Sequence, residues 1–226
     1  MRGCFVTGTD TGVGKTVLAA AIVASLRERG VEASALKPVI TGLDEPAASG
    51  WPADHELLAA VSGRAPEDVI VSGFGPAVSP HLAAELAGRP LGLAALRQAT
   101  LAAAGATEVC VIEGVGGLLV PLDEAFLLRD LARELGLPIV IVARPGLGTI
   151  NHTLLTIESA RYAGLEVAGV VLTPWPERPD EIERSNHLTI ARLGDVEVGT
   201  LGRVAAPEPR LLAEAAAQLP LDRWLR

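Results

Sequence analysis

Gly8-Thr9-Asp10-Thr11-Gly12-Val13-Gly14-Lys15-Thr16 is the stretch of sequence that decides the fold. It follows a short apolar run at residues 3–7 and leads directly into a helical pattern. Closely spaced backbone N–H groups bind phosphates, and glycines let the backbone approach them. The stretch therefore predicts a phosphate loop in which Lys15 reaches the β- and γ-phosphates and Thr16 ligates Mg²⁺. Five residues separate Gly8 from Gly14, so the loop is one residue longer than the common pattern.

Short apolar runs alternate with helical patterns along the rest of the chain. The runs predicted as strands are 3–7, 33–36, 108–113, 138–143, 167–172 and 198–201. The predicted helices are 15–29, 54–61, 93–104, 126–135, 149–163, 180–193 and 209–218, while 42–52 and 73–80 are predicted as loops. Continuous runs of Val, Ile, Leu and Ala are typical of strands buried on both faces of a parallel sheet. The pattern predicts an α/β fold, a doubly wound and mostly parallel sheet of the P-loop NTPase kind, with residues 1–226 as one domain.

Glycines follow five of the predicted helices, at positions where a C′ glycine is expected. They are Gly30, Gly105, Gly136, Gly164 and Gly194.

Composition argues against several classes of function. The formal net charge is −8 and no basic cluster occurs, so binding to nucleic acid or to an anionic membrane is not expected. Cys4 and Cys110 lie in apolar runs and are interpreted as small core residues. No signal peptide and no run of about 18 apolar residues is present, which predicts a cytoplasmic protein.

Lysine is rare in this chain, since Lys15 and Lys37 are the only two among 19 basic residues. Arginine serves the ordinary surface charge, whereas lysine is a compact point charge whose pKa shifts readily. Lys37 follows the second predicted strand, in Lys37-Pro38-Val39-Ile40-Thr41-Gly42. The sparsity indicates chemistry at both lysines, although chance remains the alternative for Lys37. Asparagine is equally sparse and occurs only at Asn151 and Asn186.

A carboxylate ends the third predicted strand, where Glu113 precedes Gly114-Val115-Gly116-Gly117. In P-loop folds an acid at the end of a neighbouring strand faces the magnesium ion. Asp54 opens a predicted helix and is either a third oxygen ligand or a plain helix cap. Mg²⁺ keeps several waters, so Thr16, Asp54 and Glu113 form a sufficient set of ligands.

A second helix start with bare backbone N–H groups is predicted at residues 146–152. Gly146-Leu147-Gly148-Thr149-Ile150-Asn151-His152 is either an anion site or a simple capped turn.

Together these motifs resemble the dethiobiotin synthetase family, whose members are ATP-dependent ligases. The lengthened phosphate loop at residues 8–16 matches the family's own variant. Lys37-Pro38-Val39 with Thr41-Gly42, Ser79-Pro80-His81, Glu113–Leu118 and Gly148–His152 resemble its other motifs, in order and spacing. The resemblance covers residues 3 to about 172.

The resemblance implies a reaction of 7,8-diaminononanoate with CO₂ and ATP. CO₂ forms a carbamate on one amine, and the carbamate attacks the γ-phosphate to give a mixed carbamic–phosphoric anhydride. The second amine then closes the ring and releases phosphate, with Mg²⁺ required. The family works as a homodimer with sites at the subunit interface, so Asn151 is expected to serve the neighbouring subunit.

The resemblance also implies a role for each matching residue. The catalytic set is Lys15, Lys37 and Thr11, and the set that binds the diamine and its carboxylate is Thr11, Lys37, Thr41, Gly116, Gly117, Leu118, Gly148, Thr149 and Asn151.

The match is weakest where the family reads the nucleotide base. Thr173-Pro174-Trp175-Pro176 stands where many members carry an asparagine, and the second base loop at 202–204 departs from the usual proline. Thr173, Pro174, Gly202 and Val204 are the expected base contacts. Trp175 either stacks on the base or is a residue of the core or dimer surface, and the second interpretation is preferred. We therefore expect loose base selectivity. Gly12 stands where some members carry a glutamate that contacts the nucleotide.

Two other functions fit the same fold. Amide-forming ligases such as cobyrinate synthases need a glutaminase domain with a nucleophilic cysteine, for which the chain has no room. A ParA/MinD-type ATPase switch carries an additional lysine early in the phosphate loop, where this chain has Gly8-Thr9-Asp10.

Overall fold

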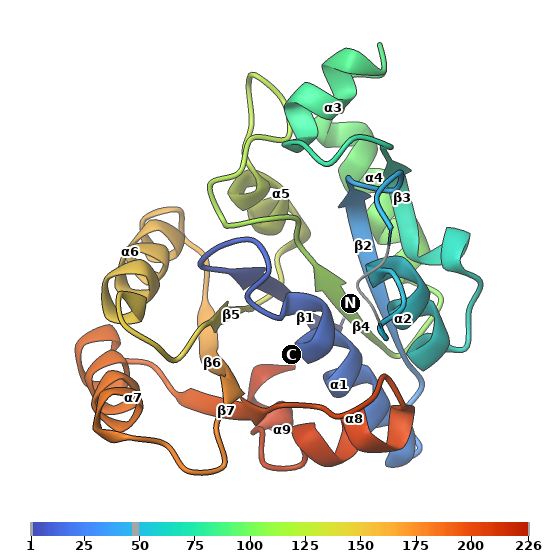
Figure 1. Ribbon diagram of the computed structural model, residues 1–226. Coiled ribbons are helices and arrows are strands. Elements are labelled where there is room, and N and C mark those ends of the chain that lie inside the picture. The colour runs from blue at the N-terminus through green and yellow to red at the C-terminus, as the bar shows by residue number, and fades with distance from the viewer. Residues whose placement is uncertain (1, 47–49, 226) are drawn as a thin grey trace.

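A seven-stranded sheet forms the centre of the computed structural model, which describes residues 2–46 and 50–225 (Figure 1). Every pair of neighbouring strands runs parallel, in the order β3-β2-β4-β1-β5-β6-β7. The strands are β1 (Arg2–Gly8), β2 (Ala33–Ile40), β3 (Ile70–Gly73), β4 (Val109–Glu113), β5 (Ile139–Ala143), β6 (Val167–Trp175) and β7 (Val198–Gly202). The predicted α/β, doubly wound sheet is confirmed, and the part of the sheet that the structure describes is parallel throughout.

Helices connect the strands and lie on both faces of the sheet. They are α1 (Lys15–Glu28), α2 (Asp54–Ser62), the 3₁₀ helix η1 (Pro66–Val69), α3 (Pro80–Leu86), α4 (Leu93–Ala104), α5 (Leu128–Leu135), α6 (Thr149–Tyr162), α7 (Glu181–Gly194), α8 (Pro209–Ala216) and α9 (Leu221–Trp224). Within the described ranges, none of these helices has the length and apolar character of a membrane-crossing segment.

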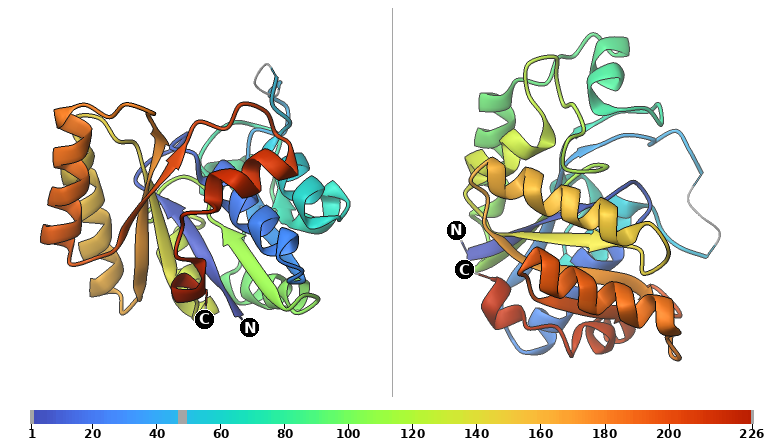
Figure 2. Two further views of the ribbon diagram at one scale, coloured as in Figure 1. Left: turned by 90° about the horizontal axis from the view of Figure 1, so that it is seen from below. Right: turned by 90° about the vertical axis from the view of Figure 1, so that its left-hand side faces the viewer.

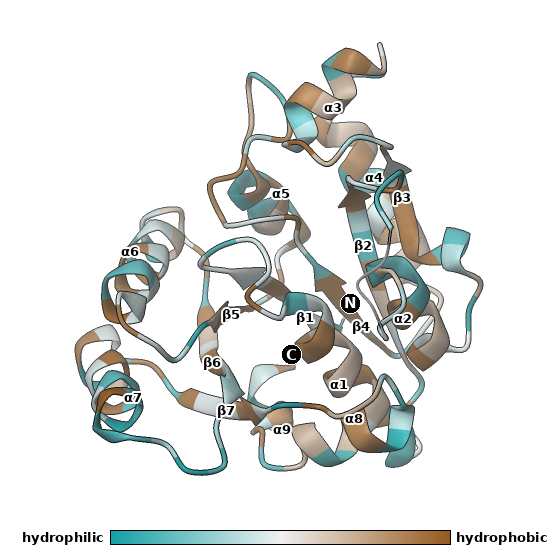
Figure 3. Ribbon diagram, viewed as in Figure 1, coloured by the Kyte–Doolittle hydropathy of each residue, from teal (hydrophilic) through white to brown (hydrophobic). Residues whose placement is uncertain are grey.

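Two apolar layers enclose the sheet. Side chains of α1, α2, α8 and α9 pack on one face, and side chains of α3 to α7 pack on the other. Figure 2 shows α6 and α7 on one side of the sheet and α1 and α8 on the opposite side. Every residue of β4 and β5 is buried, which explains why these strands carry almost no polar residues. In Figure 3 the strands and α1 are mostly hydrophobic, and hydrophilic residues concentrate on α5, α7 and the turn before α7.

The connections change direction at β1, and this determines where the carboxyl ends of the strands form a crevice. The chain passes from β1 to β2 and then β3 at the sheet edge, returns to β4 beside β1, and crosses β1 to continue through β5, β6 and β7. Ligands of open α/β sheets bind at such a switch point, outside the carboxyl ends of the strands. The phosphate loop follows β1 at that point.

The second strand is longer than predicted, because β2 continues through Pro38 to Ile40. Residues 33–36 pair with β4, whereas residues 37–40 pair with β3. Pro38 lies just beyond the β4 pairing and between the residues registered with β3, so its missing N–H removes no ladder bond. Lys37 therefore lies inside β2 rather than at the end of the strand.

The short elements β3, α3, η1 and α9 were not predicted from the sequence pattern. Pro80 begins α3 at the end of the 73–80 segment that was predicted as a loop, and proline is favoured at the first position of a helix. Residues 47–49 of the predicted 42–52 loop lie outside the described residues.

Three of the five predicted helix-ending glycines adopt positive φ, at Gly30, Gly136 and Gly164. Gly105 does not, since its φ is −68°. Gly194 is the last residue of α7, and Asp195 takes the left-handed position with φ 42°. A Cβ at Gly194 would lie 2.9 Å from Ile157 Cδ1, so this glycine instead allows α7 to approach α6 closely.

Candidate active site

The phosphate loop is a tight connection between β1 and α1. Gly12 and Gly14 have φ of 69° and 100°, which side chains rarely adopt. Gly14 precedes the first turn of α1 and leaves its N–H groups without a side-chain cap. Lys15 Nζ donates to the backbone oxygen of Asp10 at 2.9 Å, which folds the ammonium back over the loop. The loop thus presents backbone donors and a buried cation to one small volume.

Lys37 joins two carboxylates beside this loop. Its Nζ donates to Asp54 Oδ2 at 2.5 Å and to Glu113 Oε1 at 2.6 Å. The hydroxyl of Thr16 donates to the same Glu113 oxygen at 2.9 Å. Four residues that are distant in sequence therefore meet at the ends of β2 and β4 and the start of α1. Asp54 is the first residue of α2 and does not cap it, since the N-cap is Ala53.

Burial and mutual attraction shift the pKa values of these groups. Burial alone lowers the pKa of Lys37, but Glu113 and Asp54 outweigh it and raise the pKa. Burial alone raises the pKa of Asp54, but the Lys37 ammonium outweighs it and lowers the pKa. For Glu113, which is fully buried, burial prevails over Lys37 and raises the pKa. Glu113 and Asp54 share the single Lys37 ammonium, so the negative charge of the more buried Glu113 is the less well compensated.

Lys15 differs from Lys37 because it has no carboxylate as a direct partner. Burial lowers the pKa of Lys15 to about 8. Attraction by Glu113 raises the pKa and repulsion by Lys37 lowers it, but burial is the largest effect. A polyanion placed in the loop would compensate this buried ammonium.

The oxygen atoms around Lys37 suit a small hard cation. Thr16, Asp54 and Glu113 supply one hydroxyl and two carboxylates, and the second Glu113 oxygen, Oε2, is buried without a hydrogen-bond partner. In this structure the Lys37 ammonium lies among these oxygens as a stand-in cation. The described residues contain no group of three or more His, Cys, Asp or Glu side chains with metal-binding geometry. Few protein ligands are typical of Mg²⁺ at nucleotide sites.

A cavity of about 310 Å³ opens over this cluster. Of the predicted residues, it collects Thr11, Gly12, Gly14, Lys15, Thr16, Lys37, Thr41, Asp54, Glu113 and Gly116. It therefore brings together side chains from β2, β4, α1, α2 and the phosphate loop.

A more apolar groove of about 430 Å³ lies on the other side of the phosphate loop, towards α6. It is lined by residues 8–11, 117–121 and the α6 residues His152, Leu155, Thr156 and Ser159. Gly117 packs against the phosphate loop, since a Cβ there would lie 3.4 Å from the Gly8 oxygen. The volume and the apolar residues of the groove suit an alkyl chain between Thr11 and α6.

The predicted residues at the start of α6 do not line these two cavities. Gly148 and Asn151 are exposed, and Gly148 has φ 90°. Thr149 is buried, its N–H bonds Gly146 O at 3.2 Å and its hydroxyl lies 3.4 Å from that of Thr153. The side chain of Thr149 is thus already engaged within the chain. The first turn of an α-helix leaves further N–H groups unpaired, here those of Ile150 and Asn151.

The four expected base contacts meet at a third pocket, of about 240 Å³, which adjoins the phosphate loop. Thr173, Pro174, Gly202 and Val204 line it together with residues 12–14 and 17. Thr173 lies close to the loop, since a Cβ on Gly14 would be 2.9 Å from Thr173 Cγ2. Trp175 does not line this pocket and stacks edge-on against His187 of α7, which agrees with its interpretation as a core residue.

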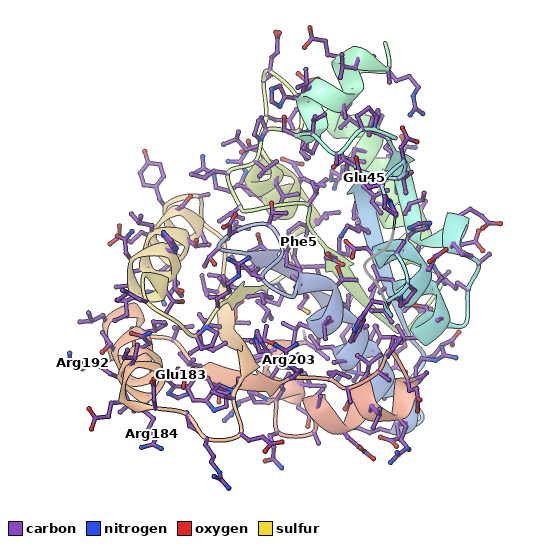
Figure 4. All side chains as sticks on the ribbon, in the orientation of Figure 1. Phe5, Glu45, Glu183, Arg184, Arg192 and Arg203 are labelled. Carbon is purple, nitrogen blue, oxygen red and sulfur yellow. The ribbon has the colours of Figure 1, made fainter. Side chains whose placement is uncertain are left out.

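Three residues at the site, Arg144, Trp51 and Asn186, were not singled out from the sequence for a role in it. Arg144 and Trp51 line the pocket beside Thr173, as does Arg203, which Figure 4 shows on the segment after β7. Arg144 Nη2 lies 3.4 Å from Thr11 O and 3.5 Å from Gly12 O. The Arg144 side chain lies next to Gly12, which has no side chain. Asn186 contacts the loop before α6. Only the rarity of asparagine marked any of them in the sequence.

Solved structures with a similar fold include a ParA family ATPase and a cell division complex. A ParA family ATPase from Chlorobium tepidum matches with a TM-score of 0.58 at 13% identity, over 96% of this chain and 99% of that one. MinD in the MinC:MinD cell division complex of Aquifex aeolicus matches with a TM-score of 0.55 at 14% identity, over 95% of this chain and 86% of that one. At these identities the likeness shows the fold alone, and the predicted P-loop NTPase fold is confirmed.

Sequence relatives are more informative. A family model described as an AAA domain matches residues 2–206. The ATP-dependent dethiobiotin synthetase BioD of Anaeromyxobacter dehalogenans is 45% identical over 195 residues, which cover 85% of this chain and 86% of that protein. The enzymes of the same name from Bacillus licheniformis and Bacillus subtilis strain 168 are 41% and 36% identical, over 85% and 88% of this chain and 81% and 85% of those proteins. The chain belongs to the dethiobiotin synthetase family.

Proposed function

We propose that this chain is an ATP-dependent dethiobiotin synthetase, a ligase that closes the ureido ring of dethiobiotin from 7,8-diaminononanoate and CO₂. One amine adds to CO₂ and forms a carbamate, whose oxygen attacks the γ-phosphorus of ATP and releases ADP. The second amine attacks the carbonyl carbon of the mixed anhydride, and phosphate leaves as the ring closes. The observation that carries the proposal is the meeting of Lys37 with the phosphate-loop cluster, at 2.5–2.6 Å from both carboxylates.

The two lysines neutralise the charge of this reaction. Carbamate and γ-phosphate are both anions, and their approach is disfavoured unless cations lie between them. Lys15 is buried in the phosphate loop, and Lys37 extends from β2 to the same cavity. Thr11 and Thr41 line that cavity as hydrogen-bonding groups for the amine and carbamate end of the substrate. These roles explain why the chain keeps lysine at these two positions.

Thr16, Asp54 and Glu113 are the proposed ligands of the magnesium ion that accompanies ATP. When bound, the ion neutralises phosphate oxygens and orients the γ-phosphate. In the structure the Lys37 ammonium bonds one oxygen of each carboxylate, and the Thr16 hydroxyl donates to the same Glu113 oxygen. Thr16, Asp54 and Glu113 would hold the ion, and Lys37, which lines the same cavity, would contact the γ-phosphate and the carbamate.

The nucleotide extends from the phosphate loop into the pocket lined by Thr173, Pro174, Gly202 and Val204. The substrate chain follows the groove along Gly116, Gly117 and Leu118 towards the start of α6. There the free N–H groups of the first turn bind the carboxylate, aided by the helix dipole. Gly148 and Thr149 shape this turn through its backbone, since the Thr149 side chain bonds within the chain.

A second copy of the chain completes the groove at α6, in a homodimer with Asn151 serving the neighbouring subunit. Leu147 and Tyr162 are 96% and 91% exposed, and Leu155 is 56% exposed. Leu147 precedes α6, whereas Leu155 and Tyr162 lie on it, and Leu155 also lines the groove. Exposed apolar side chains of this size favour contact with a partner surface. A Leu155→Arg variant is expected to shift the species seen by analytical ultracentrifugation to monomer. A dimer that persists in this variant would move the interface elsewhere.

Residues 1–226 act as one domain in this proposal, supported by the single continuous sheet. A cytoplasmic location fits the two cysteines, Cys4 and Cys110, which are free thiols.

The experiment that tests the proposal is phosphate release from MgATP, measured with and without 7,8-diaminononanoate and bicarbonate. Release that requires both the diamine and bicarbonate is the expected result. Release that ignores the diamine would overturn the proposal and favour a nucleotide switch of the ParA or MinD kind. No residue in Gly8–Asp10 supports such a switch, because this part of the loop carries no lysine.

A further inference from the structure

A buried asparagine interrupts the apolar side of α7. The residues of α7 that are buried against the protein are Asn186, Ile190 and Gly194, spaced four apart along one side of the helix. Figure 4 shows Arg184 and Arg192 on this helix directed outward. An apolar residue is the ordinary choice at the position of Asn186, because burying an amide is unfavourable unless it is hydrogen-bonded. Asn186 is only 6% exposed, so its partners explain its presence.

Both partners of Asn186 are backbone oxygens of the loop between β5 and α6. Its Nδ2 donates to Pro145 O at 2.8 Å and to Gly146 O at 3.2 Å. Two consecutive carbonyls can only accept, so the amide must present its NH₂ group to them. The Asn186 side chain therefore fixes the position of the β5–α6 loop relative to α7.

The held loop touches both ends of the proposed site. On one side, Arg144 reaches the phosphate-loop oxygens of Thr11 and Gly12. On the other side, Gly146 O also accepts from Thr149 N at 3.2 Å, which sets the first turn of α6. That turn carries the N–H groups proposed to bind the substrate carboxylate.

We infer that Asn186 is a positioning residue, which holds the 145–149 loop so that the start of α6 meets the carboxylate of the diamine substrate. This inference rests on the proposed function. Asn186 touches no substrate, and it acts through the two carbonyls that it binds. Small displacements of a binding turn reduce substrate binding strongly because the contacts are directional.

The test compares Asn186→Asp and Asn186→Ser with wild type in diamine-dependent phosphate release. Asn186→Asp keeps the shape but replaces the donor with an acceptor facing two carbonyls, and Asn186→Ser retains a single smaller donor. We expect KM for 7,8-diaminononanoate to rise about tenfold in Asn186→Asp and less in Asn186→Ser. KM for ATP stays within about twofold. Hydrogen exchange at Thr149 and His152, whose N–H groups bond Gly146 O and Gly148 O, is measured on the folded protein without substrate and becomes faster in both variants.

The matched control is His187→Ala, at the next position of α7. His187 Nε2 lies 3.1 Å from Val198 O and its ring contacts Trp175, so this variant loosens α7 without touching the loop. It is expected to lower Tm and leave the diamine KM unchanged. If Asn186→Asp changes the diamine KM no more than His187→Ala does, or if both KM values rise together with the loss of Tm, the inference is wrong. Wild-type enzyme without diamine-dependent release would instead refute the proposed function itself.

Discussion

The two sides of the site, separated by the phosphate loop, differ in the chemical groups that they present. On the side of β2 and β4, charged side chains of Lys15, Lys37, Asp54 and Glu113 converge within hydrogen-bonding distance of one another or of the loop. On the side of β5, β6 and β7, the expected ligand contacts are mostly backbone groups and apolar surface. Transfer of a phosphoryl group between two anions needs cations at fixed positions. A base or an alkyl chain, in contrast, can be bound by a complementary apolar surface.

This difference implies unequal sensitivity to substitution. A buried charge that loses its partner leaves the other charge uncompensated, and the cost is large. A backbone contact survives most changes of side chain, so the second side tolerates variation. Substitutions on the β2–β4 side are therefore expected to abolish turnover, and those on the other side to change affinity and selectivity.

The largest effect is expected at Lys37. Lys37→Ala removes a cation between carbamate and γ-phosphate, and turnover falls by roughly a thousandfold. Nucleotide binding stays measurable, because the phosphate loop and Lys15 are intact. Steady-state phosphate release and the binding of a fluorescent nucleotide provide the two measurements.

Lys37→Met is the matched control, since it keeps the length and packing of the side chain without the charge. It is expected to be as inactive as Lys37→Ala but closer to wild type in Tm. Turnover near the wild-type level in either variant would remove Lys37 from the chemistry.

The second effect is expected at Glu113. Glu113→Gln replaces the carboxylate with a neutral amide and weakens Mg²⁺ binding by the proposed ligands. The Mg²⁺ concentration for half-maximal turnover is therefore expected to rise about tenfold. Titration of turnover with Mg²⁺ at fixed nucleotide measures this shift. An unchanged titration would exclude Glu113 from the ligands of the ion.

The sequence predicted the functional residues on the β2–β4 side because these residues act through their side chains, whose chemistry follows from residue type. Gly14-Lys15-Thr16, the isolated Lys37 and a glutamate after an apolar run each have a recognisable pattern, and the structure brings them together. The direct bond between Lys37 and Asp54 did not follow from the sequence, because the path of residues 42–53 determines it. The cap expected at Asp54 fell one residue earlier for the same reason.

The other side was less predictable because its contacts depend on tertiary packing. Arg144 contacts the phosphate loop and Asn186 contacts the loop that follows Arg144, and no local pattern reveals either contact. Thr149 has a place in the resemblance, yet its hydroxyl faces Thr153 within α6. The short strand β3 was missed since its four residues carry too little periodicity to be recognised.

The third prediction concerns base selectivity. The base pocket is lined by Thr173, Arg144, Arg203 and apolar or glycine residues, without a side-chain amide or carboxylate among the lining residues. Discrimination of adenine by its edge needs a paired donor and acceptor. Turnover with ATP, CTP and GTP at subsaturating concentration is therefore expected to differ by about tenfold or less. An ATP preference above about 100-fold, or 2.7 kcal/mol, would contradict loose selectivity.

The smallest effect on turnover is expected at the two cysteines, which lie under the β2–β4 side in β1 and β4. Both are buried, and burial raises the pKa of Cys4 to about 12 and that of Cys110 to about 11, from a usual value of 9.0. Both thiols therefore stay protonated in the folded protein at pH 10, while the thiols of the unfolded chain ionise. The resulting stability is complete below pH 9 and is lost as the pH rises towards the folded values.

A Cys4→Ala, Cys110→Ala double variant separates this effect from other groups that titrate at alkaline pH. Between pH 8 and pH 10 the wild-type free energy of unfolding should fall by roughly 2–3 kcal/mol more than that of the variant, since each unfolded thiol contributes about 1.4 kcal/mol at pH 10. Urea unfolding at the two pH values measures the difference, and turnover at pH 7.5 stays unchanged. Equal losses in both proteins would mean that the thiols ionise in place. The sheet beneath the charged cluster would then be more open to water than its burial indicates.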